Sequence, residues 1–291
     1  MKPFKLGTAE IDGEGTAVVL IGGRVFVLSE ILRVPTVHSL LDLLKQWGAL
    51  QDRLADAAEN VSGDGYDAQG LKYLPPILEP RKLICIGVNY RDHIAEMKAP
   101  DVPAFPYAFL RPPTSLAAHG EDIRLPAMPR MVDWEAELGV VVGASAGKSN
   151  GAAVPAVAGY TIINDVSARD WIANRPWVGI DWVMQKAWDK FQPTGPWITP
   201  AQFVTDPQSL AIELSVNGAV KQKSNTSQMI FGVKAIVAHL AGIMTLEPGD
   251  IIATGTPAGV GFGRNPPEFI RPGDSVRVTI EALGTLENRF V

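Results

Sequence analysis

The sequence contains one cysteine, Cys85, and so cannot form a disulfide within the chain. It has no uninterrupted apolar stretch of about 18 residues, the length that a membrane-spanning helix requires, and its first residues lack the apolar core of a signal peptide. Basic residues do not cluster, and the formal net charge is −5, which argues against a nucleic-acid partner. We therefore expect a cytoplasmic protein of a reducing compartment, with neither a membrane nor a nucleic acid as its partner.

The residues that are present predict a mainly β protein with some α-helix. With 291 residues, 46% of them hydrophobic, the chain can bury a large core. Short apolar runs alternate with turns rich in the 28 glycines and 23 prolines, as strands and hairpins do. Leucines at helical spacing predict one or two helices over 36–60, and a similar pattern predicts a helix over 227–244 that begins at Thr226 or Ser227.

The chain also divides by composition. A polar, glycine-rich stretch, "VSGDGYDAQG", separates the first helical region from a new strand-like run that begins near residue 77. Such stretches commonly mark boundaries between compact units. We therefore predict a small N-terminal α+β domain over residues 1–77 and a larger domain over residues 78–291.

Acids gather at the head of an apolar run, "VDWEAELGVVVG", residues 132–143. Glu135 and Glu137 are two residues apart, so on a strand they point to the same face. Three interpretations are open: a solvated strand end, a salt-bridge cluster, or a metal site in which a cation offsets the repulsion. Asp165 likewise ends the strand-like "GYTIIND". A set of carboxylates offers only oxygen, which favours Mg²⁺ or Mn²⁺ over zinc.

A histidine and a glutamate in "GVNYRDHIAEM", residues 87–97, are candidates for acid–base chemistry. His93 and Glu96 are three residues apart on an expected helix and are therefore neighbours on one face. A carboxylate beside an imidazole orients the ring and raises its basicity, which is how a general base is built. The alternative is an ordinary surface pair without a catalytic role.

Two further stretches could hold an anion. Lys186 lies in the apolar, proline-rich "MQKAWDKFQPTGPW", where it could neutralise a substrate carboxylate or enolate; a snorkelling surface lysine is the alternative. In "PGDIIATGTPAGVG", residues 248–261, a strand ends in a turn whose hydroxyls and backbone N–H groups could bind an anion, or which is a plain hairpin turn. The stretch has neither a P-loop nor a dinucleotide-binding pattern, which argues against nucleotides.

Six segments in a fixed order resemble the fumarylacetoacetate hydrolase family over residues 81–291. They are "GVNYRDHIAEM", "DWEAELGVVVG", "NDVSARD", "KAWDKFQPTGPW", "NGAVKQKSNTSQMIF" and "PGDIIATGTPAGVG". The resemblance implies a mainly β fold with some α, a β-sandwich roll that carries the site at one end, after the variable N-terminal segment of bacterial-type members. It also implies a homodimer that acts on a small molecule.

The resemblance assigns roles to the candidate residues. It implies a divalent metal, Mg²⁺ or Mn²⁺, held by three carboxylates, those of Glu135, Glu137 and Asp165. It implies a dyad that activates water on a segment that closes over the substrate, so that the catalytic residues are His93, Glu96 and Lys186. The implied substrate-binding residues, which would hold a carboxylate through a hydroxyl, a backbone N–H and an ammonium group, are Thr256, Gly255 and Lys186.

Two departures narrow the choice of reaction. Ile172 stands where fumarylacetoacetate hydrolases proper carry a glutamine, and "QKA", residues 185–187, replaces their "GKS". The chain therefore fits better the branch that acts on other 2-oxo acids. Our first expectation is a metal-dependent hydrolase that cleaves a C–C bond of acylpyruvate-type 2,4-dioxo acids through a metal-stabilised enolate. The alternatives are an oxaloacetate decarboxylase, a 5-carboxymethyl-2-hydroxymuconate-type isomerase or hydratase and, more distantly, a non-catalytic binding protein.

Overall fold

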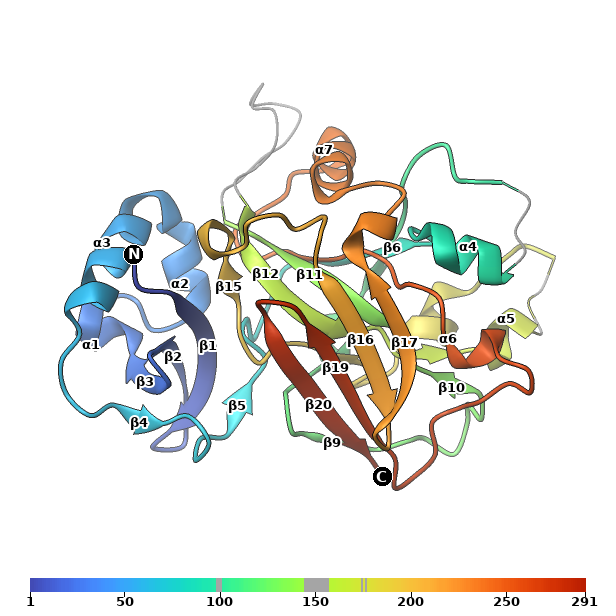
Figure 1. Cartoon of the computed structure of the whole chain (residues 1–291), viewed down its shortest axis with the longest axis horizontal. Helices are drawn as coiled ribbons and strands as arrows, with labels where there is room; N and C mark the ends of the chain where they lie inside the picture. The colour runs from blue at the N-terminus through green and yellow to red at the C-terminus, as the bar shows by residue number, and fades with distance from the viewer. Residues whose placement is uncertain (98–100, 144–156, 174, 176) are drawn as a thin grey trace.

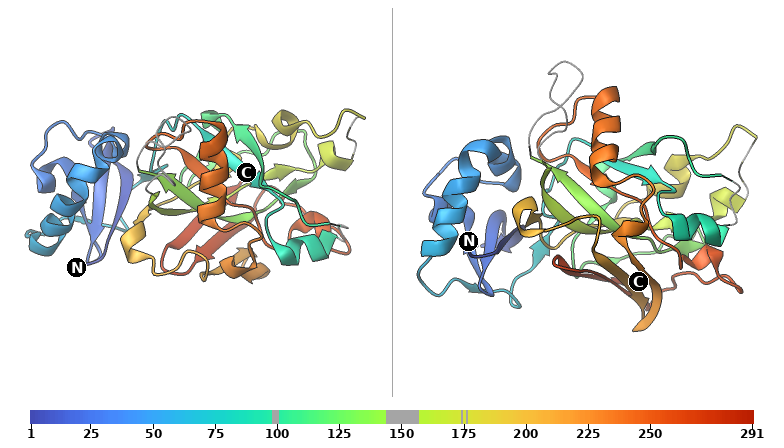
Figure 2. Two further views of the ribbon diagram at one scale, coloured as in Figure 1. Left: turned by 90° about the horizontal axis from the view of Figure 1, so that it is seen from above. Right: turned by 45° about the horizontal axis from the view of Figure 1, so that its top comes forward.

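The structure is a computed structural model that describes residues 1–97, 101–143, 157–173, 175 and 177–291. Its elements form two parts that lie side by side along the long axis of the molecule (Figure 1, Figure 2). The N-terminal part is a five-stranded sheet with three helices, and the larger part is built on a six-stranded and a five-stranded sheet. The expected mainly β fold with some α-helix is confirmed.

The N-terminal part opens with a hairpin. Its elements are β1 (Phe4–Ile11), β2 (Glu14–Ile21), β3 (Arg24–Val27), α1 (Leu28–Leu32), α2 (Leu40–Lys45), α3 (Trp47–Asn60), β4 (Tyr66–Asp67) and β5 (Tyr73–Leu74). Asp12 and Gly13, with φ of 52° and 83°, form the two-residue turn between β1 and β2, a turn that matches the twist of paired strands. Ser39 caps α2 by a reciprocal bond with Asp42. The helices expected over 36–60 are thus confirmed.

Two sheets packed face to face form the larger part. The first contains, in spatial order, β15 (Thr199–Pro200), β12 (Val157–Asn164), β11 (Ala136–Val142), β18 (Ile251–Ala253), β6 (Leu83–Gly87) and β7 (Tyr107–Arg111). The second contains β17 (Ala219–Asn225), β16 (Ala211–Val216), β19 (Ser275–Ile280), β20 (Gly284–Phe290) and β9 (Asp122–Ile123). Burial alternates along β19, as expected of a strand with one face on a core. The β-sandwich is therefore the observed architecture.

Strand β11, which leads away from the acids, is covered on both faces. Every one of its residues is buried. Leu138 and Val140 belong to the core between the two sheets, whereas Val141 belongs to a second cluster that includes Leu6 and Trp47 of the N-terminal part. The two parts thus share buried apolar surface, and the domain boundary near residue 77 stays a prediction.

The late helix is shorter than the sequence pattern predicts. It is α7 (Val233–Ile243), and Thr226–Gln228 form a separate 3-10 turn. The segment between them turns away because the N–H groups of Ile230 and Phe231 bond to Asn89 at 2.7 and 2.9 Å. The expected start is therefore wrong, because a partner distant in the sequence takes the backbone donors that a longer helix would have used.

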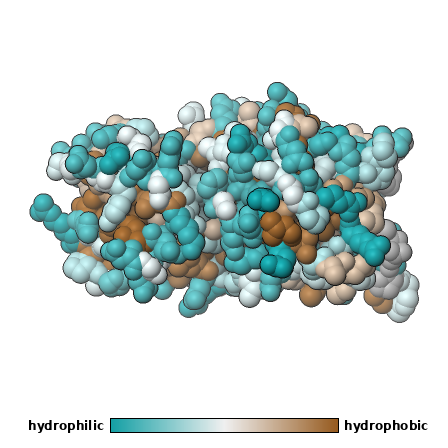
Figure 3. All heavy atoms as spheres, turned by 90° about the horizontal axis from the view of Figure 1, so that it is seen from below, coloured by the Kyte–Doolittle hydropathy of each residue, from teal (hydrophilic) through white to brown (hydrophobic). Residues whose placement is uncertain are grey.

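Three short helices lie at the end of the larger part that is away from the N-terminal sheet (Figure 1, Figure 2). They are α4 (Arg91–Met97), α5 (Asp170–Ala173) and α6 (Trp182–Lys186). No helix among the described residues is long and apolar enough to cross a bilayer. On the face in Figure 3, hydrophobic surface lies among hydrophilic surface over both parts, which is ordinary for a folded protein. The cytoplasmic location stays a prediction.

Candidate active site and metal centre

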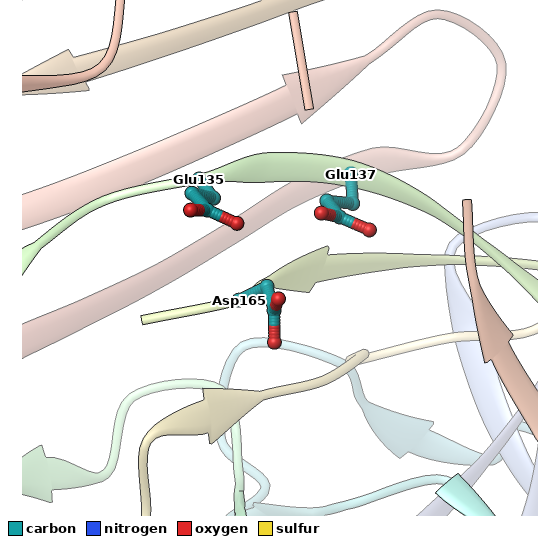
Figure 4. A group of neighbouring side chains, drawn as sticks. All are labelled: Glu135, Glu137 and Asp165. Carbon is teal, nitrogen blue, oxygen red and sulfur yellow. The ribbon is translucent and has the colours of Figure 1, made fainter. Parts of the chain in front are cut away.

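Three carboxylates converge where β11 begins and β12 ends. Glu135 comes just before β11, Glu137 lies on it, and Asp165 directly follows β12. Figure 4 shows both glutamates on one side of their strand, near Asp165 of the neighbouring strand. One carboxylate oxygen from each residue lies within 4.8 Å of the other two. All three residues are buried, and Glu137 is only 1% exposed, so a solvated strand end is excluded.

Buried cations pair with two of these carboxylates. Lys186 Nζ donates to Glu135 at 2.7 Å and also to Asp165. Arg169 donates to the other oxygen of Glu135 at 2.6 Å, and Arg111 pairs with Asp165. All three cationic residues are buried. The salt-bridge interpretation is therefore confirmed for Glu135 and Asp165, and Lys186 is not a snorkelling surface lysine.

Of the three carboxylates, Glu137 is the one that no cationic side chain of the described residues contacts. Among the described residues it forms no ion pair, and its Oε2 accepts the N–H of Gly255 at 2.7 Å. Burial, with Asp165 and Glu135 nearby, raises the pKa of Glu137 well above its usual value. Burial would also raise the pKa of Glu135, but its two cationic neighbours lower it to about 2. An additional positive charge would therefore stabilise the ionised form of Glu137.

The charges and the ligand types fit a hard divalent cation. Four acids and three bases are buried in this cluster, so that its net charge is −1 when all are ionised: Asp133, Glu135, Glu137, Asp165, Arg111, Arg169 and Lys186. Three carboxylates form an all-oxygen donor set, which suits Mg²⁺ or Mn²⁺. Each carboxylate oxygen has more than one lone pair, so its bonds to the bases leave room for a metal contact.

A histidine and a glutamate on α4 form the second functional group. His93 Nδ1 lies 3.1 Å from Glu96 Oε2, as their spacing on one helical face predicts. The other oxygen of Glu96 accepts the N–H of Gly259 at 2.9 Å. Partial burial would raise the pKa of Glu96, but these two bonds lower it overall. An ionised Glu96 holds Nδ1 of the ring, which leaves Nε2 of His93 for proton transfer.

The three carboxylates and His93 line one cavity of about 200 Å³. Its polar wall includes His93, Glu135, Glu137, Asp165, Lys186 and Thr256. Apolar side chains such as Phe109, Trp182 and Phe262 form much of the remainder. Cavities for drug-sized ligands measure roughly 300–1,000 Å³, so this one suits a smaller molecule. A short acid could therefore reach both the carboxylates and His93.

The threonine and glycine turn lies beside the carboxylates, but its donors already have partners. The hydroxyl of Thr256 donates to the carbonyl of Ala136 at 3.0 Å and accepts from Gln222 Nε2 at 2.9 Å. Gly255, with a φ of 95° that favours glycine, gives its N–H to Glu137. Thr256 lines the cavity. The roles of Thr256 and Gly255 toward a substrate stay predictions.

The predicted role of Thr256 requires its hydroxyl to turn from the carbonyl of Ala136 and donate to a substrate carboxylate. Replacing Thr256 by valine should then lower kcat/KM for a 2-oxo acid about tenfold to a hundredfold, because a hydrogen bond to a charged group contributes about 1.5–3 kcal/mol. Gln222 Nε2 would also lose one of its two acceptors and keep the carbonyl of Pro257 at 2.8 Å, so Tm should fall.

Thr254→Val is the matched control, since Thr254 is fully buried and its hydroxyl donates to Leu138 O at 2.8 Å. The control should lower Tm and leave kcat/KM unchanged. Equal losses of kcat/KM in both variants would show that only packing is affected.

Sequence reasoning missed the buried groups that hold the site together. Asp133 is fully buried; it accepts the N–H groups of Gly261 and Phe262 at 2.6 and 3.0 Å and pairs with Arg169 at 2.9 Å. Asp133 and Arg169 thus connect the loop that contacts Glu96 to the carboxylate cluster. The sequence offered two signals: Asp133 stands just before the two glutamates, and Arg169 lies in the same segment as Asp165. Neither spacing distinguishes these residues from surface residues.

Comparison with known proteins identifies the family of this chain. Residues 82–291 match the family described as Fumarylacetoacetate (FAA) hydrolase C-terminal. This chain belongs to the fumarylacetoacetate hydrolase family, as the sequence segments predict.

Three of the similar proteins are named as enzymes. Oxaloacetate tautomerase fahd2, mitochondrial, of Xenopus laevis is 43% identical over 223 residues, which are 76% of this chain and 69% of that protein. The structure of 5-carboxymethyl-2-hydroxymuconate delta-isomerase from Mycobacterium smegmatis is 31% identical with a TM-score of 0.73, and the match covers 99% of this chain and 98% of that one. Maleylpyruvate hydrolase from Sphingobium sp. SYK-6, solved with manganese (II) ion and pyruvate, is 28% identical with a TM-score of 0.78 and the same coverage.

Proposed function

We propose that this protein is a divalent-metal-dependent enzyme that enolises small 2-oxo acids, and that its main reaction interconverts the enol and keto forms of oxaloacetate. The observation that carries the proposal is that His93, paired with Glu96, lines the same cavity as the three carboxylates. The 43% identity to an oxaloacetate tautomerase supports this substrate. The small volume of the cavity is compatible with a four-carbon acid.

The proposed reaction moves a proton between C3 and the C2 oxygen of the substrate. A divalent ion held by the three carboxylates would supply Lewis-acid stabilisation of negative charge on that oxygen. In the enol-to-keto direction, His93 takes the proton of the C2 hydroxyl at Nε2 and gives it to C3, and in the reverse direction it takes the proton from C3 and returns it to the oxygen; Glu96 keeps the ring oriented. Burial would lower the pKa of Lys186, but Asp165 and Glu135 raise it overall. Lys186 therefore stays charged and adds positive potential beside the substrate oxygens.

The enol form of oxaloacetate absorbs in the near ultraviolet, so its decay measures the reaction directly. We expect protein loaded with Mg²⁺ to accelerate this decay above the spontaneous rate. Exhaustive treatment with EDTA should remove the acceleration, and Mg²⁺ or Mn²⁺ should restore it. No acceleration by metal-loaded protein would refute the proposed activity, and full acceleration after EDTA would refute the metal requirement.

A second reaction, hydrolysis of acylpyruvate-type 2,4-dioxo acids, uses the same groups. In it, His93 takes a proton from water and the hydroxide attacks the C4 carbonyl. The C3–C4 bond then breaks, the C4 side leaves as a carboxylic acid, and the pyruvate enolate takes a proton at C3 to give pyruvate. The likeness to a maleylpyruvate hydrolase favours this candidate. A panel of four substrates distinguishes the candidate reactions. It consists of acetylpyruvate, fumarylpyruvate, oxaloacetate (assayed for decarboxylation) and 5-carboxymethyl-2-hydroxymuconate. If the protein cleaved acetylpyruvate faster than it converted enol-oxaloacetate, hydrolysis would be its main reaction. Turnover of any member excludes a mere binding protein.

We also propose a homodimer. Strand β7 is an edge strand of its sheet. Large apolar side chains on or beside segments that line the cavity are exposed: Phe105 by 62%, Leu110 by 57% and Trp177 by 96%. An unpaired edge with exposed apolar residues favours association with another chain. Light scattering should give about twice the 31.3 kDa of one chain, and Leu110→Glu should shift the mass toward one chain. A single-chain mass for the wild type would contradict the proposal.

A further inference from the structure

One buried amide in the cavity wall has no partner for its oxygen. Gln185 lies on α6 beside Lys186, and it is only 2% exposed. It lines the cavity that the carboxylates and His93 share. Its Oε1 atom is buried and accepts no hydrogen bond from the residues that the structure describes. A buried acceptor without a partner is destabilising, so its presence in a cavity wall indicates a contact with a ligand.

The Gln185 side chain is not what holds α6 in place. The carboxylate of Asp181 caps the helix by accepting the N–H of Met184 at 3.0 Å. The backbone N–H of Gln185 donates to the carbonyl of Asp181, also at 3.0 Å. These bonds would remain if the Gln185 side chain were apolar. The amide is therefore available to a ligand at no cost to the helix.

Other buried polar atoms also lack partners, but they do not point to a ligand in this cavity. Nε and Nη2 of Arg111, the hydroxyl of Tyr90 and the hydroxyl of Thr199 are examples. None of these three residues lines the cavity. Among the described residues, Gln185 is thus the one that both lines this cavity and has a buried side-chain atom without a partner.

We propose that the amide of Gln185 binds the second carboxylate of a 2-oxo dicarboxylic acid and so determines substrate specificity. This rests on the proposed function, in which the 2-oxo end of the substrate lies at the three carboxylates. Besides Gln185, the described residues that line the cavity include an exposed cation, Arg175, and two apolar residues, Ile172 and Ile180. An ionised carboxylate only accepts hydrogen bonds, so it cannot bond the amide oxygen. Rotation of the amide by about 180° places the N–H groups at the position of the unpaired oxygen, and in that orientation they can donate to the carboxylate.

The test compares ligands with and without the second carboxylate. Gln185→Leu keeps a similar volume and removes the hydrogen bond. It should lower kcat/KM for enol-oxaloacetate about tenfold to a hundredfold, the range for a hydrogen bond to a charged group. In calorimetry with Mg²⁺-loaded protein, the affinity for ketomalonate should fall by a similar factor, while the affinity for pyruvate, which has one carboxylate, should not change. Unchanged ketomalonate affinity, or an equal loss for pyruvate, would overturn the inference.

Stability separates a ligand contact from a structural one. Gln185→Leu removes an unpaired buried acceptor, so Tm without ligand should stay the same or rise. Gln192→Leu is the matched control: Gln192 is 1% exposed, does not line the cavity, and contacts Cys85 Sγ at 3.6 Å. The control should lower Tm and leave ligand affinities unchanged. If Tm of Gln185→Leu fell so far that part of the protein was unfolded at the assay temperature, and this unfolded share matched the lost activity, the result would contradict the inference.

The two proposals fail separately. If the wild type does not accelerate the tautomerisation of oxaloacetate, the proposed function is wrong. The binding of ketomalonate and pyruvate to wild type and Gln185→Leu would still decide whether the amide recognises a second carboxylate, because calorimetry needs no turnover.

Discussion

Replacing Glu137 by glutamine should abolish turnover and weaken Mg²⁺ binding more than about a hundredfold, and the chain should remain folded. Loss of a group that only supports a metal ligand typically costs about 10–100-fold in metal affinity, and Glu137 is proposed as a ligand itself. It is also the carboxylate of the three that forms no ion pair with the described residues. Calorimetric titration with Mg²⁺ and the enol decay assay measure the two losses.

The same substitution should stabilise the metal-free protein at neutral and alkaline pH. Burial and two neighbouring carboxylates raise the folded-state pKa of Glu137. A carboxyl with a raised folded-state pKa contributes stability at low pH that is lost as the pH rises through that pKa. A glutamine stays neutral, so Tm of the variant in EDTA should fall less toward alkaline pH than Tm of the wild type. Mg²⁺ should raise Tm of the wild type alone.

Glu135→Gln is the control, because the two glutamates lie on the same strand face but differ in partners. Burial would raise the pKa of Glu135, but Lys186 and Arg169 lower it to about 2. Removing this charge takes one of two carboxylate partners from each of two buried cations, which leaves Lys186 with Asp165 and Arg169 with Asp133, so the variant should lose stability in EDTA. Equal losses of Tm in both glutamine variants would contradict the assigned difference between the carboxylates.

The acids of the site could be predicted from the sequence because strand geometry fixes their direction. Glu135 and Glu137 alternate along one segment, and Asp165 ends another, so local periodicity places all three at strand ends. Their buried counter-charges could not be predicted in this way. Arg111 lies in strand β7 and meets Asp165 across 54 residues of sequence. Only the sheet order, which no local pattern reveals, brings these two residues together.

The same limit applies to the fold. Short apolar runs between turns predicted strands, and leucines at helical spacing predicted the region of α2 and α3. Both predictions were possible because these patterns depend only on neighbouring residues. The predicted start of α7 was wrong because Asn89, far away in the sequence, accepts hydrogen bonds from the N–H groups of Ile230 and Phe231. Gln185 was noticed only as a departure from the family's glycine; its burial and the missing partner of its oxygen depend on the folded cavity.

Replacing His93 by alanine should separate the reactions that this site could perform. Tautomerisation and hydrolysis both need a base, so each should slow about 10²- to 10⁴-fold. Decarboxylation of oxaloacetate needs only stabilisation of the enolate and should lose far less. Mg²⁺ affinity should not change, because His93 is not among the three carboxylate residues proposed as metal ligands. Enol decay, acetylpyruvate cleavage and CO₂ release, measured on one preparation, give the three rates.

Two controls decide what His93 does in this comparison. His38→Ala removes an exposed histidine of the N-terminal part and should leave all three rates unchanged. Glu96→Gln keeps the imidazole but removes the carboxylate that lies 3.1 Å from His93 Nδ1, so it should slow the two base-dependent reactions by less than His93→Ala does. Equal losses in all three reactions of His93→Ala would mean that the ring only positions the substrate. The general base would then have to be sought among the other titratable groups of the cavity, of which Lys186 is charged and engaged with two carboxylates.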